Sequence, residues 1–312
     1  MKRSALVLAL VCGLGLSSQA QAQSKRFKGK PIEAGLFLGG SNYMGDLTPS
    51  IAFGETHMAG GLICRFNYSD FVTLRGNAVF GRISGDDKNY GDMNGSSDEI
   101  FRYQRNLSFR SNVMEISAIA EWNLAGFGET MRDRPSSPYL FGGVGIFKYN
   151  PLAQFNYMPD VTDAAGYKIH DPQLEKFDGQ WIELQTLATE GQETTKFNDR
   201  RRYPLTQVCI PIGIGYKAQF DDYWAIGMEF GIRQTFTDYL DDISKDYVDE
   251  AIVGGNNGLL AAALADRSPE LGYSKFEFGT QRGDNGKTDR YMFFGLTLTR
   301  KIVGGKTVCF QF

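Results

Sequence analysis

The sequence predicts an all-β fold, an eight-stranded antiparallel transmembrane β-barrel with long extracellular loops and short periplasmic turns. Three observations predict it: eight segments alternate apolar with polar or small residues, their connections alternate between short and long, and the first residues resemble an export signal. The composition agrees, because 37 glycines, 15 tyrosines and 23 phenylalanines in 312 residues suit many short strands joined by turns.

The composition also excludes several classes of protein. With 42% hydrophobic and 22% charged residues, the chain is too apolar and too weakly charged to be disordered. A formal net charge of −3 argues against an electrostatic nucleic-acid binder. Only two histidines occur, which leaves little room for histidine-based catalysis.

The first 22 residues are predicted to be a cleaved secretory signal peptide. Lys2 and Arg3 form a basic start, residues 4–16 are uncharged and rich in Leu, Val and Ala, and Ala20-Gln21-Ala22 fits the small-x-small cleavage pattern. The alternative is an uncleaved membrane anchor, but the apolar run is too short to span a bilayer. We therefore expect an outer-membrane location and this organisation: signal peptide 1–22, basic periplasmic leader 23–30, barrel 31–302 and short periplasmic tail 303–312.

Period-two alternation marks strands whose two faces meet different environments. The eight alternating segments are 32–43, 56–68, 71–83, 107–124, 139–149, 205–220, 223–237 and 290–302. Their apolar faces include, in that order, Leu36 and Leu38, Leu62 and Phe66, Leu74 and Phe80, Ile116 and Trp122, Leu140 and Ile146, Ile212 and Ile214, Ile226 and Met228, and Leu296 and Leu298.

The lengths of the connections predict which environments these faces meet. Only Ser69-Asp70 and Asp221-Asp222 separate two of the segment pairs, and a moderate turn at 125–138 separates a third. The other connections are longer and cover residues 44–55, 84–106, 150–204 and 238–289. Strict alternation of short and long connections is typical of a transmembrane β-barrel with periplasmic turns and extracellular loops.

The face opposite the apolar one decides between this barrel and a soluble sandwich or lipocalin-like barrel. In the soluble folds an apolar core lies opposite a charged outer face. Here the opposite face is rich in glycine and carries mid-strand charges, as expected for the narrow lumen of an eight-stranded barrel. The candidate lumen charges are Arg65, Arg75, Glu115, Glu121, Glu229 and Arg233. Unpaired buried charges are costly, so we expect Arg–Glu pairs inside the lumen.

Aromatic residues near the segment ends are expected to form girdles at the membrane interfaces. They are Tyr68, Phe71, Trp122, Tyr139, Tyr223, Trp224 and Tyr291.

Signals for chemistry are weak. His57 and His170 lie far apart, and the sequence contains no nucleophile elbow, zinc-protease motif or Walker-type loop. We therefore expect no enzyme, cofactor or metal site. Cys64, Cys209 and Cys309 would remain after cleavage, an odd number that we interpret as small buried groups or free thiols.

Two loop clusters have alternative interpretations. The acidic run 238–242 offers carboxylates, notably Asp241 and Asp242, that are suitable for calcium, although the spacing of an EF-hand is missing. The basic run 200–202 is suitable for lipopolysaccharide phosphates. For both clusters, ordinary solvation of a loop is the default interpretation.

Several strings, taken together, resemble a known family. They are EAGLFLGGSNYMGDL at 33–47, YLFGGVG at 139–145 followed by Asn150-Pro151, TEGQ at 189–192, IPIG at 210–213 and TFTDYLDD at 235–242. In this order they resemble the PorG-like (DUF6089-type) outer-membrane barrels of the type IX secretion system, over most of residues 31–302. The two longest loops, 150–204 and 238–289, depart from that pattern.

The resemblance implies a non-enzymatic part of a secretion and gliding machine. Such a barrel would link a periplasmic ring, made by a PorK/GldK-type lipoprotein and a PorN/GldN-type ring protein, to the outer membrane. Partners would also include outer-membrane lipid and lipopolysaccharide. The candidate periplasmic contact surface consists of the turn at 126–137 and the basic leader with Lys25, Arg26, Lys28 and Lys30. Alternatives are a small porin-like barrel, a ligand-binding barrel or adhesin, and an outer-membrane enzyme.

Overall fold

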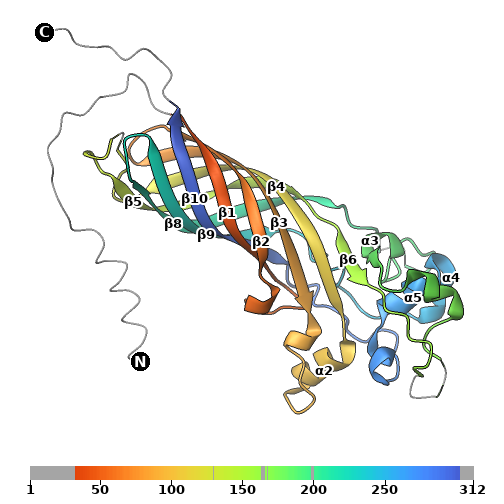
Figure 1. Ribbon diagram of the computed structural model, residues 1–312. Helices are drawn as coiled ribbons and strands as arrows, with labels where there is room; N and C mark the ends of the chain where they lie inside the picture. The colour runs from red at the N-terminus through yellow and green to blue at the C-terminus, as the bar shows by residue number, and fades with distance from the viewer. Residues whose placement is uncertain (1–31, 129, 163–165, 167, 198–199, 303–312) are drawn as a thin grey trace, which may run out of the picture.

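The computed structural model describes residues 32–302 except 129, 163–165, 167 and 198–199, and it shows a closed barrel with a cap at one end (Figure 1). The predicted signal peptide, leader and tail lie outside the described residues. The barrel strands are β1 (Ile32–Met44), β2 (His57–Asn67), β3 (Val72–Asp86), β4 (Ser108–Asn123), β5 (Ser136–Lys148), β8 (Thr206–Gln219), β9 (Trp224–Thr235) and β10 (Arg290–Ile302). The predicted segments differ from these strands by a few residues at most.

Every pairing of neighbouring barrel strands is antiparallel, and the pairing closes on itself. The first and last strands pair from Ile32 with Ile302 to Met44 with Arg290. The circle is completed where β3 pairs with β4, from Val72 with Trp122 to Asp86 with Ser108. Closure leaves no sheet edge in the barrel wall, which is the condition for a sheet to cross a lipid bilayer. The predicted eight-stranded transmembrane barrel is confirmed.

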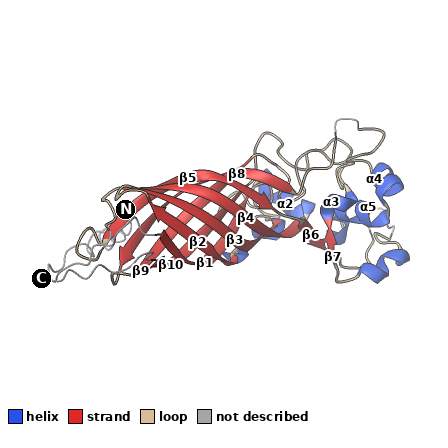
Figure 2. Ribbon diagram, turned by 90° about the horizontal axis from the view of Figure 1, so that it is seen from above, coloured by secondary structure: helices blue, strands red, loops and turns tan. Residues whose placement is uncertain are grey.

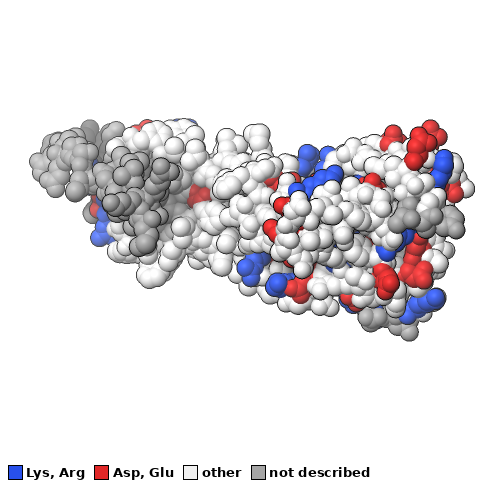
Figure 3. Space-filling view, turned by 90° about the horizontal axis from the view of Figure 1, so that it is seen from below, with Lys and Arg blue, Asp and Glu red and all other residues white. Residues whose placement is uncertain are grey.

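The outer wall of the barrel is an apolar belt. Leu38, Ile116 and Val144 are each more than 60% exposed, and nearly every outward position beside them is aliphatic, aromatic or glycine. On β4, the ten steps from Trp122 to Asn112 cover about 33 Å of strand, or about 25 Å at a tilt near 40°, which matches the height of a lipid-facing band. Figure 3 shows this wall almost without charge, while charged groups crowd the cap.

One end of the barrel carries the three short turns, at 68–71, 124–135 and 220–223, together with the start of β1 and the end of β10 (Figure 1). The other end carries the four long connections. In outer-membrane barrels the short turns face the periplasm and the long loops face outward, and that rule orients this molecule. Among the described residues, no helix combines the length and the apolar character that a bilayer crossing demands.

The predicted girdle is correct only in part. Tyr68, Phe71, Trp122 and Tyr223 are exposed at the periplasmic end, and Trp224 is half-buried there. Tyr139 and Tyr291 were wrongly assigned to the girdle, because both side chains are buried in the lumen. Successive side chains of a strand point to opposite faces, and both tyrosines stand next to a lipid-facing position and not on one. Tyr139, for example, precedes the exposed Leu140 and points to the same face as the buried Phe141.

The long connections fold together into a cap (Figure 2). The short strands β6 (Pro151–Gln154) and β7 (Trp181–Glu183) extend the sheet from the outer half of β4. The helices of the cap are α2 (Ser97–Arg105), α3 (Leu184–Leu187), α4 (Glu250–Asn257) and α5 (Leu259–Ala265), with 3-10 turns η2 (Phe53–Glu55), η3 (Asp87–Asn89), η4 (Pro172–Phe177) and η5 (Ser268–Leu271).

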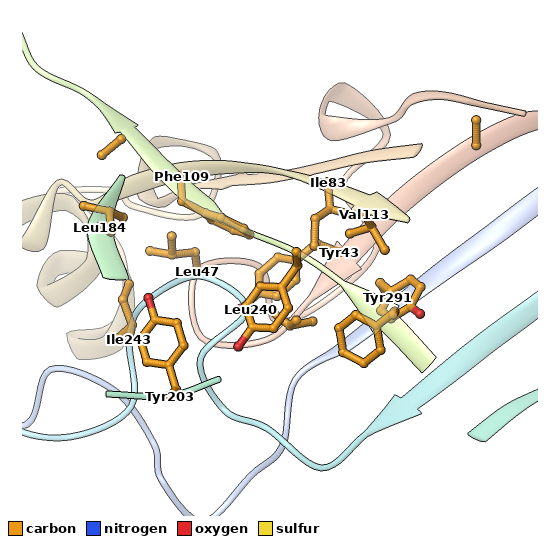
Figure 4. Close-up of a cluster of buried hydrophobic side chains, with 14 of the residues drawn as sticks. Tyr43, Leu47, Ile83, Phe109, Val113, Leu184, Tyr203, Leu240, Ile243 and Tyr291 are labelled. Carbon is orange, nitrogen blue, oxygen red and sulfur yellow. The ribbon is translucent and has the colours of Figure 1, made fainter. Parts of the chain in front are cut away.

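Local sequence explains where the cap helix α2 begins and ends. Ser96 and Glu99 form a reciprocal capping box at its start, and Asn106 ends it in the left-handed conformation with φ of 54°. The cap has its own apolar core, drawn in Figure 4, in which Leu47, Leu184, Leu240 and Ile243 meet from three different connections. This core joins the aromatic filling of the lumen at Tyr291, so cap and barrel are packed as one body.

Prediction for the lipid-facing belt. A charge at the centre of the belt must be desolvated by lipid, so Ile116→Arg should destabilise folding into phosphatidylcholine vesicles by about 2–4 kcal/mol. The free energy of unfolding is measured by urea titration, followed by Trp fluorescence and by heat-modifiable gel migration. Met93→Arg, on the exposed cap, is the matched control and should change it little. Equal effects of the two substitutions, or a freely water-soluble chain, would contradict the lipid-facing assignment.

Candidate functional site: a charged, sealed lumen and its cap

The lumen contains a network of buried charges built around Glu121 on β4. Its carboxylate lies 2.9 Å from Arg65 Nε, 3.0 Å from Arg75 Nη1 and 2.7 Å from Lys217 Nζ. Arg75 also donates to Glu229 Oε2 at 2.6 Å, and the Tyr139 hydroxyl donates to the same oxygen at 3.0 Å. These groups come from six strands, so the network joins opposite walls of the barrel.

A second, smaller group lies nearer the cap. Arg233 Nε donates to Glu115 Oε2 at 3.0 Å, and the Tyr291 hydroxyl donates to the same oxygen at 2.9 Å. The structure therefore places all six candidate lumen charges inside the barrel and divides them into two groups. Arg65, Arg75, Glu121 and Glu229 form the periplasmic group, while Glu115 and Arg233 form the outer one.

Sequence reasoning missed Lys217, Glu33 and Lys301, which are also buried in the lumen. Glu33 accepts hydrogen bonds from Asn67 and Thr299, at 2.7 and 2.9 Å. The signal was present, because Lys217 lies on the face opposite Tyr216 and Ala218 in the alternating pattern. All three residues lie near a strand end, outside the centre of the apolar belt. A charge that points outward is tolerated there, so the residue type alone does not assign the side chain to the lumen.

Glycines make room for the aromatic side chains that fill the rest of the lumen. A β-carbon added at Gly215 would lie 2.3 Å from the Tyr139 ring, and one at Gly231 would lie 2.6 Å from the Phe141 ring. The glycines of the lumen face therefore serve its packing, in agreement with the glycine-rich face that the sequence predicts for a narrow lumen.

The periplasmic mouth is covered by the turn at 124–135. Its Phe127 is buried, with Lys217 Nζ 4.7 Å from the ring centroid, and Gln219 donates to the Gly128 carbonyl at 2.6 Å. Arg134 binds this turn to Asp70 of the neighbouring turn at 3.1 Å. The opposite surface of the turn, with Met131 and Arg132, is exposed. It belongs to the candidate contact surface 126–137; Lys25, Arg26, Lys28 and Lys30 lie outside the described residues.

The outer mouth is covered by the cap, which is held by buried polar contacts. Arg282 pairs with Glu190 at 3.0 Å and donates to the Asp242 carbonyl at 2.8 Å, and Arg105 pairs with Asp87 at 2.6 Å. The Tyr43 hydroxyl, at the end of β1, donates to Asp241 at 2.7 Å and lies 3.0 Å from Asp289. Hydrogen bonds from Tyr43 thus connect Asp241 and Asp289, at the two ends of the last long connection, to the rim of the barrel.

The calcium interpretation of Asp241 and Asp242 does not fit this arrangement. Asp241 accepts from Tyr43, whereas Asp242 accepts from Tyr203 at 2.6 Å and from Thr189. The two carboxylates therefore have separate protein partners. Over the described part of the chain, no cluster of three His, Cys, Asp or Glu side chains could hold a metal ion.

Burial alters the acidity of the cap carboxyls. It raises the pKa of Asp238 to about 9, and the nearby carboxylates of Asp46, Asp241 and Glu190 act in the same direction. Burial also raises the pKa of Asp242 to about 6, although the Arg282 guanidinium opposes the shift. Asp238 lines a polar cleft of about 930 Å³ between α2 and residues 280–290.

The two described cysteines have different surroundings. Cys64 is exposed on the lipid-facing side of β2, and Cys209 is buried in the lumen, where its sulfur lies 3.5 Å from the Tyr291 hydroxyl. Neither forms a disulfide. Cys309 lies outside the described residues.

Comparison with protein-family models identifies the family of this chain. Residues 6–169 match the family described as "Domain of unknown function (DUF6089)". A search of curated proteins found no match.

Several solved structures share a weak likeness. Ail, the attachment invasion locus protein of Yersinia pestis in complex with the heparin analogue sucrose octasulfate, is 8% identical, with 88% of this chain and 99% of that chain covered and a TM-score of 0.36. OprG from Pseudomonas aeruginosa is 8% identical, with 90% and 100% covered and a TM-score of 0.39. Neisserial surface protein A is 8% identical, with 87% and 97% covered and a TM-score of 0.36. At these scores the likeness carries no argument, and the barrel rests on the register of its own strands.

Prediction for the lumen network. Glu121→Ala would leave Arg65 and Lys217 without their carboxylate in a buried site, so we expect a loss of about 3–5 kcal/mol in the free energy of unfolding. The matched control is Asp70→Asn, which removes an exposed ion pair with Arg134 and should cost about 1 kcal/mol or less. Urea titration in vesicles measures both. A Glu121→Ala loss no larger than the Asp70→Asn loss would contradict the network.

Prediction for the cap carboxyls. Asp238 holds its proton to higher pH in the folded protein than in the unfolded chain, so its contribution to stability is present at low pH and is lost as the pH rises towards about 9. The urea midpoint should therefore fall between pH 6 and pH 9, and Asp238→Asn should reduce that fall. The control is Asp284→Asn, because the hydrogen bond from Lys287 lowers the pKa of Asp284 and keeps it ionised over this range. An unchanged fall in Asp238→Asn would refute the assignment.

Proposed function

Because the chain belongs to the DUF6089 family and folds as an outer-membrane β-barrel, we propose that it is a non-enzymatic accessory of the type IX protein secretion machinery. In this role it links a periplasmic ring to the outer membrane through protein contacts. The ring components are a PorK/GldK-type lipoprotein and a PorN/GldN-type protein, as the family resemblance implies.

The observation that carries this proposal is the filled lumen. Charges and aromatic side chains pack across the barrel, the cap covers one mouth and the turn with Phe127 covers the other. An eight-stranded barrel filled in this way offers no path for a folded cargo protein. We therefore infer that the barrel acts through its surfaces, and the same packing argues against the porin-like alternative.

The surface available to a periplasmic ring is small. The turns at 68–71 and 220–223 are short, while the turn at 124–135 is longer and exposes Met131 and Arg132. Its inner side is fixed in the barrel mouth by Phe127 and Gly128. A rigid, partly apolar projection of this kind is suitable for a protein contact.

Prediction for the periplasmic contact. A photoreactive amino acid at position 131, in place of the 43% exposed Met131, should cross-link to the ring lipoprotein or its partner in living cells. The matched control replaces Met93, which is 41% exposed on the opposite, outward side and should give no such product. Products are identified by mass spectrometry after solubilisation in detergent.

A strain that lacks the protein provides the second readout. Cargo with type IX sorting domains should stay inside that strain, and the wild-type gene should restore export. Normal export without the protein would refute the role in secretion. Cross-linking from position 93 but not from 131 would refute the proposed contact surface.

A further inference from the structure

A basic patch lies on the outer wall of the barrel, where the wall meets the cap. On three neighbouring strands, β3, β4 and β5, the outward side chains at this height are Arg82, Arg110 and Lys148. The last large apolar side chains before them are Phe80, Met114 and Ile146, each 52–58% exposed.

The strand register places the three cations on one stretch of the outer wall. Arg82 is opposite Asn112, and Arg110 lies two residues further along the same face of β4. Lys148 of β5 is opposite Met114, two residues after Asn112 on the same face, so the three cations span about 13 Å along the strands. Three adjacent strands extend about 10 Å across the wall.

These cations are not neutralised by the protein. Across the residues that the structure describes, no carboxylate forms an ion pair with Arg82, Arg110 or Lys148, whereas the exposed Arg134 and Arg202 pair with Asp70 and Glu193. Arg82 donates to the neutral Asn112 at 3.1 Å.

The aromatic ring of Trp181 orders one of the cations. The guanidinium of Arg110 lies 3.3 Å from the centroid of this ring, which belongs to β7 of the cap. The ring occupies one face of the guanidinium and leaves its N–H edge available. The cap therefore holds a basic group in place at the lipid boundary.

The three cations lie together on neighbouring strands, whereas the other exposed cation described at this end of the wall, Arg290 of β10, stands alone opposite Gln234. At the corresponding height on β8 and β9 the outward residues are Thr206 and Gln234, which are uncharged. The basic run that the sequence singled out is used elsewhere: Arg200 donates to the Glu190 carbonyl at 2.9 Å, and Arg202 pairs with Glu193 at 3.1 Å within the cap. Among the described residues, the group of three neighbouring cations without an ion pair is the one on β3–β5.

We propose that Arg82, Arg110 and Lys148 bind the phosphate groups of a lipopolysaccharide molecule in the outer leaflet. They lie about 25 Å above the periplasmic end of the belt, where the acyl region ends and headgroup phosphates begin. The apolar wall below them is suitable for acyl chains, and arginine forms paired hydrogen bonds with phosphate. This inference does not depend on the proposed role in secretion.

The test measures lipid binding by the refolded full chain in neutral detergent. Three probes are compared by native mass spectrometry: lipid A with both phosphates, the same lipid A after phosphate removal, and phosphatidylglycerol. We expect the diphosphorylated lipid A to bind most tightly. The triple variant Arg82→Gln, Arg110→Gln, Lys148→Gln should bind it about tenfold or more weakly, because several charge-assisted hydrogen bonds are lost.

Arg300→Gln is the matched control. Arg300 is also exposed and lies 5.6 Å from an aromatic ring, that of Trp224, but at the periplasmic end of the wall. It should retain wild-type binding. Heat-modifiable gel migration establishes that each variant is folded, and the single variants Arg82→Gln and Lys148→Gln carry the test if the triple variant does not fold. Equal binding by wild type and the patch variants, or equally tight binding of phosphatidylglycerol or dephosphorylated lipid A, would overturn the proposal.

Discussion

The closure of the sheet between β3 and β4 is the constraint on which the rest of the molecule depends. A bilayer offers no hydrogen-bond partner to the backbone, so a spanning sheet must close. Closure with eight strands fixes a narrow bore, and every second residue of each strand must then fit inside it. In this barrel, glycines leave space for neighbouring aromatic rings in the lumen, and a buried carboxylate such as Glu121 forms ion pairs with several cations.

The charged lumen also decides what the barrel can do. The Glu121 carboxylate contacts cations from three different strands, β2, β3 and β8. Because β2 and β8 lie on opposite sides of the barrel, this carboxylate connects them across the lumen. A buried pair of this kind contributes little net stability compared with apolar packing, but breaking it is costly. The network therefore fixes one arrangement of the walls and leaves the outer surfaces of the barrel to meet other molecules.

The cap and the barrel depend on each other. The apolar core of the cap continues into the lumen through Tyr291, and Tyr43 connects the end of β1 to the acids of the last long connection. Trp181 in turn places Arg110 at the lipid boundary. The described parts of the long connections thus contact the rim of the barrel, and they shape the surface that faces outward.

The sequence by itself determined the strands, their lipid-facing sides and the six lumen charges from Arg65 to Arg233, because a period of two assigns each residue to one face. That rule, applied to Tyr139 and Tyr291, would also have placed both in the lumen rather than in the girdle. Only the tertiary structure decided which charges meet, because pairing depends on the stagger of the strands around the barrel. Glu121 on β4 meets Lys217 on β8, two strands away around the barrel, although 96 residues separate them in the sequence. The cap likewise required the structure, since its core is assembled from connections that have no regular period.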